Sequence, residues 1–474
     1  MASKNITFDS IPASIRKPGK YFEFNTRLAV RTLPANLQNM LIVAQRLATG
    51  SVLALVPTRV YSDAQAADYF GNGSMAHLMC RAAIKANPYL QLSVCALDDG
   101  AGASATGTVT IASVATVPGT LKLWVGNQSV EIAIATADAN TAVAAALKAA
   151  LDAKPDLPVT ASVTTGVVTL TARNKGLAAN AIDVSVELTA RGTTATVSGA
   201  TLSGGTIDPD PATALAKVFG EQYDVICTPY NSQAALTTLR THLDSVSGAL
   251  EQRPGCGIYG HDVALATATT MAGQINSGRI VGAYLRGTKS PDYELAAAYA
   301  AVVAGEEDPA RPLNTLALTG IHAPAVDQRL SRTEQETCLN NGVAPLEVGP
   351  GEKVQIVRAI TTYTKDAQSI TDIAFLDLTT IRTLDYVRKA CRERISLRFP
   401  REKLSSKTPD RVRTELLDVL LKLEELEIVE EVMANKDGLI VERDLQDPNR
   451  LDAKIPTDVV NGLHVFAGRI DLLL

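Results

Sequence analysis

The sequence predicts a multidomain protein of the α/β (α+β) class: an α/β core with an inserted small β-sandwich or barrel domain, then an α/β C-terminal assembly domain, with extended terminal arms. Three observations support this class. Apolar strand patterns alternate with helical patterns on both sides of residues 98–206. Within that range the composition shifts to Gly, Ala, Thr, Ser and Val with few charges. Both ends of the chain carry apolar residues in segments too short to bury a core.

We expect six segments along the 474 residues. They are an N-terminal arm (1–25), the first part of the core (26–97), an inserted β-rich surface domain (98–206), the second part of the core (207–346), a C-terminal assembly domain (347–461) and a C-terminal strand or arm (462–474). Loop-like runs, DDGAGASATG and SGGTIDPDPA, bound the insertion. Such bounds are typical of a domain inserted where two ends of its host lie close together.

The elements follow in order. MLIVAQRL and LQLSVCALDD predict strands, with a helix that begins after Ser62 and another after the turn GNGS. The inserted segment predicts hairpins about Gly126-Asn127 and Thr165-Gly166 and one Ala-rich helix, with Trp124 in the core. From residue 211, helices alternate with the strands YDVICTP, GCGIYG and RIVGAYL, which predicts a mostly parallel sheet covered by helices.

The stretch from Val354 to Arg398 predicts a β-rich run to Tyr363, a polar turn, a second apolar run and a helix from Thr379. Residues 379–407 carry nine basic and three acidic side chains, whereas residues 410–431, a second long helix, carry three basic and eight acidic ones. We expect these charged faces to be solvated or paired with each other.

Composition argues against several classes of function. A net charge of −5 gives no reason to expect nucleic-acid binding, and no run approaches the ~20 apolar residues of a membrane span. The N-terminus lacks the apolar centre of a signal peptide, and six scattered cysteines suggest reduced thiols. We therefore expect a soluble intracellular product that neither binds nucleic acid nor inserts into a membrane.

Candidates for catalysis are few. Cys256 and His261 could form a nucleophile and base, but a buried strand cysteine and a helix-capping His-Asp explain them equally well. The turn at Gly71 could bind phosphate, yet the P-loop lysine and the Rossmann glycine spacing are missing. The histidines have no partner at metal-ligand spacing. We expect no catalytic residue, cofactor or metal site.

The two ends carry the residues of most interest. The apolar side chains of the first 25 residues and of the last 13 cannot form a core alone, so we expect both segments to pack on something else. The arm residues are Ile6, Phe8, Ile11, Tyr21, Phe22, Leu463, Val465, Ile470, Leu472 and Leu474. The last segment alternates like a strand and could pair within its own sheet or be donated to a neighbour's open edge.

The chain resembles the contractile tail sheath proteins of phages, most closely the Mu type. The resemblance rests on the order and spacing of SDAQAADYFGNGSMAHLMCRAAIKANP, ELAAAYAAVVAGEEDPARPLNTLALTGI, LNNGVAPLEV with VQIVRAITTYTK, and FLDLTTIRTLDYVRKACRERISLRFPREKL. It covers nearly the whole chain outside the inserted domain.

This resemblance implies a structural subunit, not an enzyme, of the virion tail that assembles in the host cytoplasm. The subunits would stack as six-membered rings around a tail tube and contract to drive the tube through the host envelope. The partners implied are other copies of the chain, the tail tube protein, and baseplate and tail terminator proteins. The arms would add strands to neighbouring subunits, with residues 354–398 as the acceptor, and Arg388, Arg392 and Arg394 would face the tube. A doubly wound α/β enzyme and an adhesin that binds through its β-domain remain as alternatives.

Overall fold

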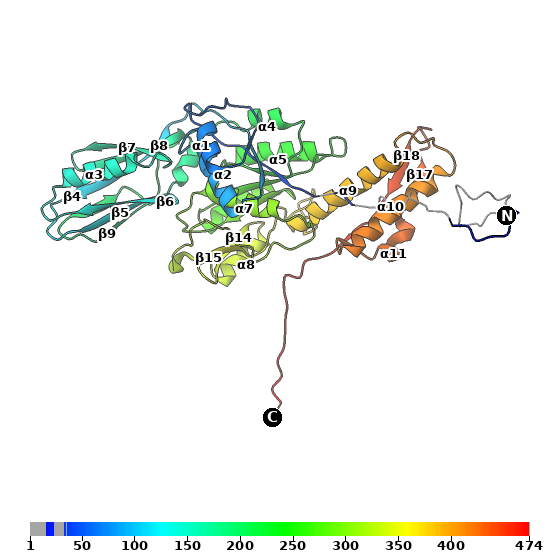
Figure 1. Ribbon diagram of the computed structural model, residues 1–474. Coiled ribbons are helices and arrows are strands. Elements are labelled where there is room, and N and C mark those ends of the chain that lie inside the picture. The colour runs from blue at the N-terminus through cyan, green and yellow to red at the C-terminus, as the bar shows by residue number, and fades with distance from the viewer. Residues whose placement is uncertain (1–15, 23–32, 35, 474) are drawn as a thin grey trace.

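The computed structural model describes residues 16–22, 33–34 and 36–473. These residues form an elongated molecule with the inserted β-rich part at one end, the α/β core in the middle and a helical C-terminal part at the other end (Figure 1). The last residues run away from the body as a tail without regular structure. The mixed α/β class is the one that the sequence predicts. The six segment bounds remain predictions.

An eight-stranded sheet forms the core, in the order β15-β14-β13-β12-β11-β1-β3-β2. Its strands are β1 (Asn39–Ile42), β2 (Thr58–Val60), β3 (Gln91–Val94), β11 (Val225–Cys227), β12 (Cys256–His261), β13 (Ile280–Tyr284), β14 (Ala344–Gly349) and β15 (Lys353–Ile356). The six inner strands are parallel, and β2 and β15 close the two ends in the antiparallel direction. Strands β11, β12 and β13 are buried along their whole length, as expected of a parallel sheet covered on both faces.

The helices of the core are α1 (Asp63–Phe70), α2 (Met75–Ala86), α4 (Ala212–Val218), α5 (Gln233–Ser247), α6 (Leu265–Ile275), α7 (Asp292–Gly305) and α8 (Arg332–Asn340), with the short 3-10 helix η2 (Val326–Gln328). Ser62 caps α1 as predicted, and Ser74, the last residue of the predicted turn, caps α2; each accepts a backbone N–H in the first turn. Helix α7 packs on β11, β12 and β13 and is covered in turn by α2. It is therefore buried on nearly every side, which explains its Ala-rich sequence.

The inserted segment forms two antiparallel sheets. One has the order β10-β4-β8-β7 and the other β6-β5-β9. The elements are β4 (Ser104–Ala112), β5 (Gly119–Val125), β6 (Gln128–Ile134), α3 (Asn140–Asp152), β7 (Val159–Thr164), β8 (Val167–Lys175), η1 (Leu177–Ala181), β9 (Val184–Leu188) and β10 (Thr194–Val197). Both predicted hairpins are present. The two ends of the insertion meet, because Ala103 N–H donates to Thr206 Oγ1 at 3.0 Å.

Trp124 is not a core residue, contrary to the prediction. It is half-buried, and its Nε1 donates to Glu187 Oε1 at 2.8 Å. The ammonium groups of Lys122 and Lys289 each lie 4.3 Å from its ring, and the edge of His322 meets it at 5.3 Å. Since Lys289 and His322 belong to the core, this tryptophan lies at the seam between the insertion and the core.

The stretch from Val354 to Arg398 contains less strand than predicted. Strand β15 ends at Ile356, and the next residues to Tyr363 form no regular strand. The free edge of β15 is also occupied, since Leu318 N–H donates to Val354 O at 2.8 Å and Ile356 N–H to Leu316 O at 3.0 Å. An edge already paired within the subunit cannot accept a donated strand, so the expected acceptor role of this stretch is not supported.

The C-terminal part is built on two long helices, α9 (Leu378–Arg398) and α10 (Thr408–Glu425), close to the predicted bounds. Short elements complete it: β16 (Val429–Glu430), α11 (Val432–Asn435), η3 (Lys436–Gly438), β17 (Ile440–Arg443), β18 (Leu451–Lys454) and β19 (Asp458–Val459). Its strands form only two-stranded sheets, β16-β19 and β17-β18. The segment predicted to be β-like after Pro456 has no strand beyond Val459 in its described residues.

Candidate assembly site

The C-terminal arm, residues 462–473, carries a run of exposed apolar side chains. Six of its side chains are between 79% and 99% exposed: Leu463, Val465, Phe466, Ile470, Leu472 and Leu473. The prediction missed Phe466 and Leu473, although both lie in the same run. Side chains this apolar are normally buried, and a large exposed apolar patch marks an interaction site. Leu474 lies outside the described residues.

The arm leaves the body at a defined point. His464 Nδ1 lies 3.1 Å from Asn314 Nδ2, and its Nε2 lies 3.6 Å from Asp377 Oδ1. Asp377 is itself held by Arg358 through two hydrogen bonds of 2.7 and 2.8 Å. Burial lowers the pKa of His464. Residues beyond His464 therefore start from an anchored position next to the N-terminus of α9.

The N-terminal arm is described only in part. Phe22 is 88% exposed, and Tyr21 donates its hydroxyl to Lys17 O within the same segment. Ile6, Phe8 and Ile11 lie outside the described residues. What is described of this segment therefore contributes no apolar side chain to the core.

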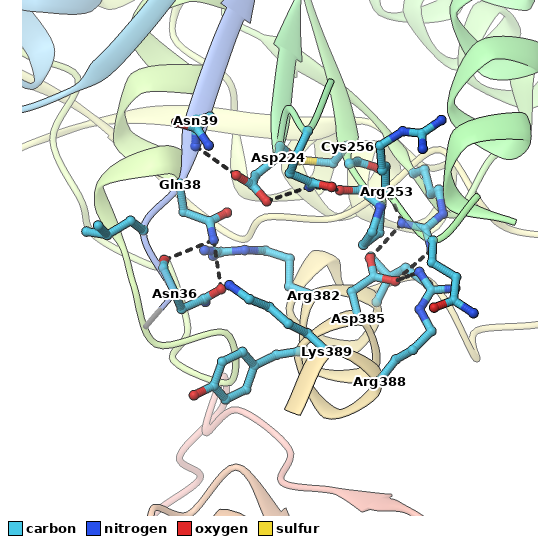
Figure 2. Close-up of a pocket in the computed structure, with 18 of the residues that line it drawn as sticks. Asn36, Gln38, Asn39, Asp224, Arg253, Cys256, Arg382, Asp385, Arg388 and Lys389 are labelled. Carbon is cyan, nitrogen blue, oxygen red and sulfur yellow. Dashed lines mark hydrogen bonds and ion pairs between the residues drawn. The ribbon is translucent and has the colours of Figure 1, made fainter. Parts of the chain in front are cut away.

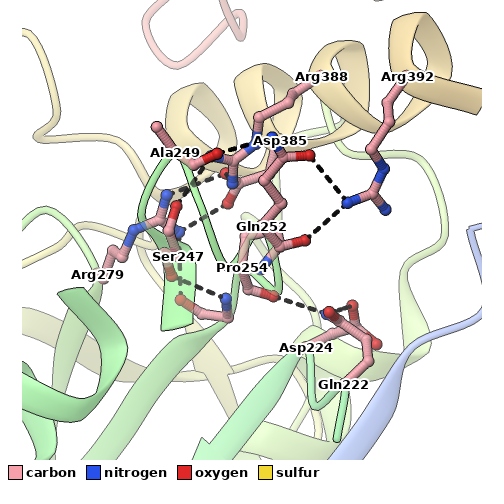
Figure 3. Close-up of polar contacts among 11 residues, drawn as sticks. Gln222, Asp224, Ser247, Ala249, Gln252, Pro254, Arg279, Asp385, Arg388 and Arg392 are labelled. Carbon is pink, nitrogen blue, oxygen red and sulfur yellow. Dashed lines mark hydrogen bonds and ion pairs between the residues drawn. The ribbon is translucent and has the colours of Figure 1, made fainter. Parts of the chain in front are cut away.

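Polar contacts fix α9 to the core (Figure 3). Arg279, the residue before β13, donates two hydrogen bonds to Asp385 of α9, at 2.7 and 2.9 Å. Arg388 also binds Asp385 at 3.0 Å and donates to Ser247 O at 2.8 Å. One turn further on, Arg392 donates to both oxygens of Gln252, at 3.0 and 3.2 Å. The bidentate pair of Arg279 and Asp385 fixes the orientation of α9 and also stabilises its contact with the core.

Arg394 lies on the other side of α9, against α10. It is only 5% exposed and donates to Glu415 at 3.1 Å and to Asp418 at 2.9 Å. Arg398 lies 3.5 Å from the same Glu415. Part of the basic block therefore pairs with the acidic block inside one subunit, which was one of the two arrangements expected.

The three arginines predicted to face a tube do not form one surface. Arg388 is half-buried against the core, Arg392 is exposed, and Arg394 is buried between the two helices. Their spacing in the sequence explains this difference, because residues 392 and 394 are two positions apart and lie on different faces of a helix.

A polar seam attaches the insertion to the core. Asn174 of β8 accepts from Met75 N–H at 2.8 Å and donates to Arg46 O at 3.0 Å. Asn127, in the β5–β6 turn, donates to Glu294 Oε2 and to Gly320 O, both at 2.9 Å. Burial raises the pKa of Glu294 to about 7. The insertion is therefore held at several points.

The two catalytic candidates are not assembled. Cys256 and His261 lie at opposite ends of β12, and an odd spacing directs their side chains to opposite faces of the sheet. Burial raises the pKa of the Cys256 thiol to about 11 and lowers that of His261 to about 4. Cys256 donates to Asp224 O at 3.4 Å rather than to an imidazole. A neutral thiol is a poor nucleophile, so these two residues do not form the nucleophile and base that the sequence suggested.

The turn at Gly71 is also occupied. Gly73 N–H donates to His77 Nδ1 at 3.0 Å, and Ser74 Oγ accepts from His77 N–H at 3.1 Å. A Cβ at Gly73 would lie 2.2 Å from Leu157 O of the insertion. Because Asn174 of the insertion also accepts the Met75 N–H, the start of α2 is covered by protein and not open to a phosphate.

The described residues contain no group of three or more His, Cys, Asp or Glu side chains placed to hold a metal ion. Among them, no helix is both long and apolar enough to cross a membrane.

Comparison with known proteins agrees with the assembly features. Residues 204–362 match the phage tail sheath protein central domain, and residues 371–472 match the phage tail sheath C-terminal domain. The Mu-like prophage FluMu tail sheath protein of Haemophilus influenzae is 34% identical over 489 aligned positions, which cover 99% of this chain and 100% of the relative.

Solved structures share the fold. The sheath tail protein of Desulfitobacterium hafniense superposes with a TM-score of 0.53 at 14% identity, covering 94% of this chain and 97% of the other. The sheath tail protein Lin1278 of Listeria innocua superposes with a TM-score of 0.51 at 16% identity, covering 91% of this chain and 94% of the other. A chain from the baseplate of the anti-feeding prophage superposes with a TM-score of 0.52 at 13% identity, covering 97% of this chain and 100% of the other.

The family matches and the full-length relative thus define a structural subunit of a tail sheath. The chain belongs to the phage tail sheath family, and its full-length relative places it with the Mu-like sheaths. Its location is the phage tail.

Proposed function

We propose that this subunit polymerises as stacked six-membered rings around a tail tube and contracts to drive the tube through the host envelope. The observation that carries the proposal is the C-terminal arm, whose six apolar side chains are at least 79% exposed in the single subunit. An arm of this composition gains free energy only when another surface covers it. Other copies of the chain, which each carry the same arm, are the natural partners.

We further propose that the acceptor is the β17-β18 sheet of a neighbouring subunit. These two strands pair only with each other among the described residues. A two-stranded sheet is marginally stable alone and leaves two edges for further strands. Strand addition satisfies these edges through backbone hydrogen bonds while the apolar side chains of the arm are covered.

Contraction requires no nucleotide in this proposal. A lattice held by donated strands can be trapped in one packing and released to another of lower free energy. The tail tube, the baseplate and the tail terminator remain proposed partners, as does the tube-facing role of Arg388, Arg392 and Arg394. Of these three, Arg392 is the exposed one and the best placed to reach a partner.

Removal of residues 463–474 tests the proposal. We expect dispersed, folded subunits in place of tubes or rings in electron micrographs, with an unchanged circular dichroism spectrum because the arm contributes nothing to the described core. A matched control replaces the exposed Leu250 of the core by Asp and should leave tubes intact. Normal tubes from the truncated chain would refute strand donation by this arm.

A further inference from the structure

A cationic cavity lies where α9 meets the core (Figure 2). Its volume is about 440 Å³, and its wall includes the segment Asn36–Asn39, the loop before β12 and one face of α9. Six basic side chains line it: Arg253, Arg279, Arg382, Arg388, Lys389 and Arg392. Three acidic side chains also line the cavity: Asp224, Glu251 and Asp385. Positive charge is therefore in excess in a confined space.

The acidic side chains already have partners. Asp385 lies between Arg279 and Arg388, and Glu251 pairs with Arg253. Asp224 accepts from Asn39 N–H at 2.8 Å and from Gln222 Nε2 at 2.9 Å. None of these three carboxylates accepts a hydrogen bond from Arg382 or Arg392.

Two of the arginines are bonded only to neutral oxygens among the described residues. Arg392 donates to the two oxygens of Gln252. Arg382 donates through Nη2 to the backbone oxygen of Glu306, whereas its buried Nη1 has no hydrogen-bond partner. In Figure 2 the Arg382 side chain extends from α9 toward the segment that holds Gln38.

Arg382 is the decisive residue. It is 8% exposed, and burial lowers the pKa of its guanidinium below the ordinary value, although the carboxylates of Glu306, Asp224 and Asp308 partly offset this effect without reaching its Nη1. Leaving a donor of a buried cation unsatisfied is costly, and such groups normally have a partner. The missing partner must be an acceptor, and the surplus of cations around it favours one that carries negative charge.

We propose that this cavity binds a small oxyanion, a phosphate or a carboxylate group, with Arg382 Nη1 as its buried donor and Arg392 at its outer side. Guanidinium groups bind both kinds of oxyanion through paired N–H groups. The wall comes from the core, from residues 36–39 and from α9, so a bound oxyanion would link the core to the C-terminal part. The site does not depend on the proposed ring assembly.

Binding is measured on the full-length chain, kept as dispersed subunits, by calorimetric titration with inorganic phosphate at constant ionic strength. We expect saturable heat and a melting temperature higher in phosphate than in chloride of equal ionic strength. A titration without heat, together with equal melting temperatures in the two salts, would overturn the proposal.

Variants place the anion in this cavity. Arg392→Gln, an exposed position outside the core, should weaken phosphate binding about tenfold, because a charge-assisted hydrogen bond to the anion is lost. Arg382→Gln should abolish the binding. Arg411→Gln is the matched control, since this exposed helix arginine pairs with Glu402 away from the cavity. Unchanged phosphate affinity in Arg392→Gln and Arg382→Gln would refute the assignment.

Polymerised protein distinguishes the two sources of the oxyanion. If a free oxyanion occupies the cavity, tubes should bind phosphate as tightly as subunits do. If an acidic side chain of a second copy enters it, tubes should lose phosphate binding and phosphate should slow polymerisation. Both outcomes support an oxyanion site and identify its occupant.

Discussion

Arg279 donates two hydrogen bonds to Asp385 across the boundary between the core sheet and α9. Its terminal nitrogens are the donors, Nη1 to Oδ2 at 2.7 Å and Nη2 to Oδ1 at 2.9 Å. The residues are 106 positions apart, and their side chains are only 13% and 17% exposed. Arg388 approaches the same carboxylate at 3.0 Å. This pair therefore fixes the C-terminal part at one defined orientation to the core.

Asp385→Ala should lower the free energy of unfolding by about 3 kcal/mol, because it leaves the largely buried Arg279 without its carboxylate. Denaturant unfolding measures this loss. The control is Asp152→Ala, which removes an i,i+4 partner of Lys148 at the surface of the insertion and should cost less than about 0.5 kcal/mol. Equal effects of the two substitutions would mean that the pair has no special role.

Charge reversal should have different effects on stability at two arginines of α9, Arg394 and Arg392. Arg394→Glu should destabilise the subunit by about 3 kcal/mol or more, because it places a third negative charge next to Glu415 and Asp418 in a buried position. Arg392→Glu should leave unfolding almost unchanged, since Arg392 is exposed. If Arg392 faces a tube, only this second variant can show it, as folded subunits that no longer co-sediment with tube protein. Normal co-sedimentation would remove Arg392 from the tube interface.

A buried carboxyl group at the start of α7 makes the stability of the fold depend on pH. Asp292 is buried at the start of α7 beside Asn231, at 3.1 Å, and burial raises its pKa from 3.8 to about 8. The unfolded chain releases this proton above about pH 4, whereas the folded chain keeps it until about pH 8. Because the unfolded state then binds fewer protons, stability should fall as the pH rises between these values.

Asp292→Asn removes this effect and is the test. Its amide resembles the protonated acid, so the fall in unfolding free energy from pH 5 to pH 8 should be shallower than in the unchanged chain, by up to about 1.4 kcal/mol per pH unit. Asp152→Asn on the surface of the insertion is the charge-matched control. Parallel stability curves for Asp292→Asn and the unchanged chain would show that Asp292 is ionised in the folded protein.

The parts of the fold that the sequence predicted well are those with local signals. Ser62 and Ser74 cap helices where the pattern placed them, and both predicted turns of the insertion close hairpins. The alternation of strands and helices also predicted the mostly parallel sheet, because the pattern depends on burial on both faces.

The errors come from contacts that no local pattern contains. The β-branched residues at Thr361 and Thr362 suggested a strand, yet their hydroxyl groups bond to Phe375 O and Ser277 O in an irregular segment. Trp124 looked like a core residue because only the folded chain brings Lys289 and His322 to its ring. The unsatisfied guanidinium of Arg382 could not be predicted either, since it depends on α9, residues 36–39 and the core meeting at one place.

Chemical crosslinking tests where the arm docks. All six native cysteines are buried, so cysteines introduced by Ile470→Cys on the arm and Ile440→Cys on β17 should be the ones that react with a short bis-maleimide. In polymerised protein that carries both substitutions we expect a ladder of covalent multimers on a denaturing gel, because each arm would reach the β17-β18 sheet of the next copy. Either substitution alone should give at most dimers, and Ile470→Cys with Tyr89→Cys, on an exposed loop of the core, is the matched control. A ladder from the control pair but not from the β17 pair would place the acceptor on the core instead.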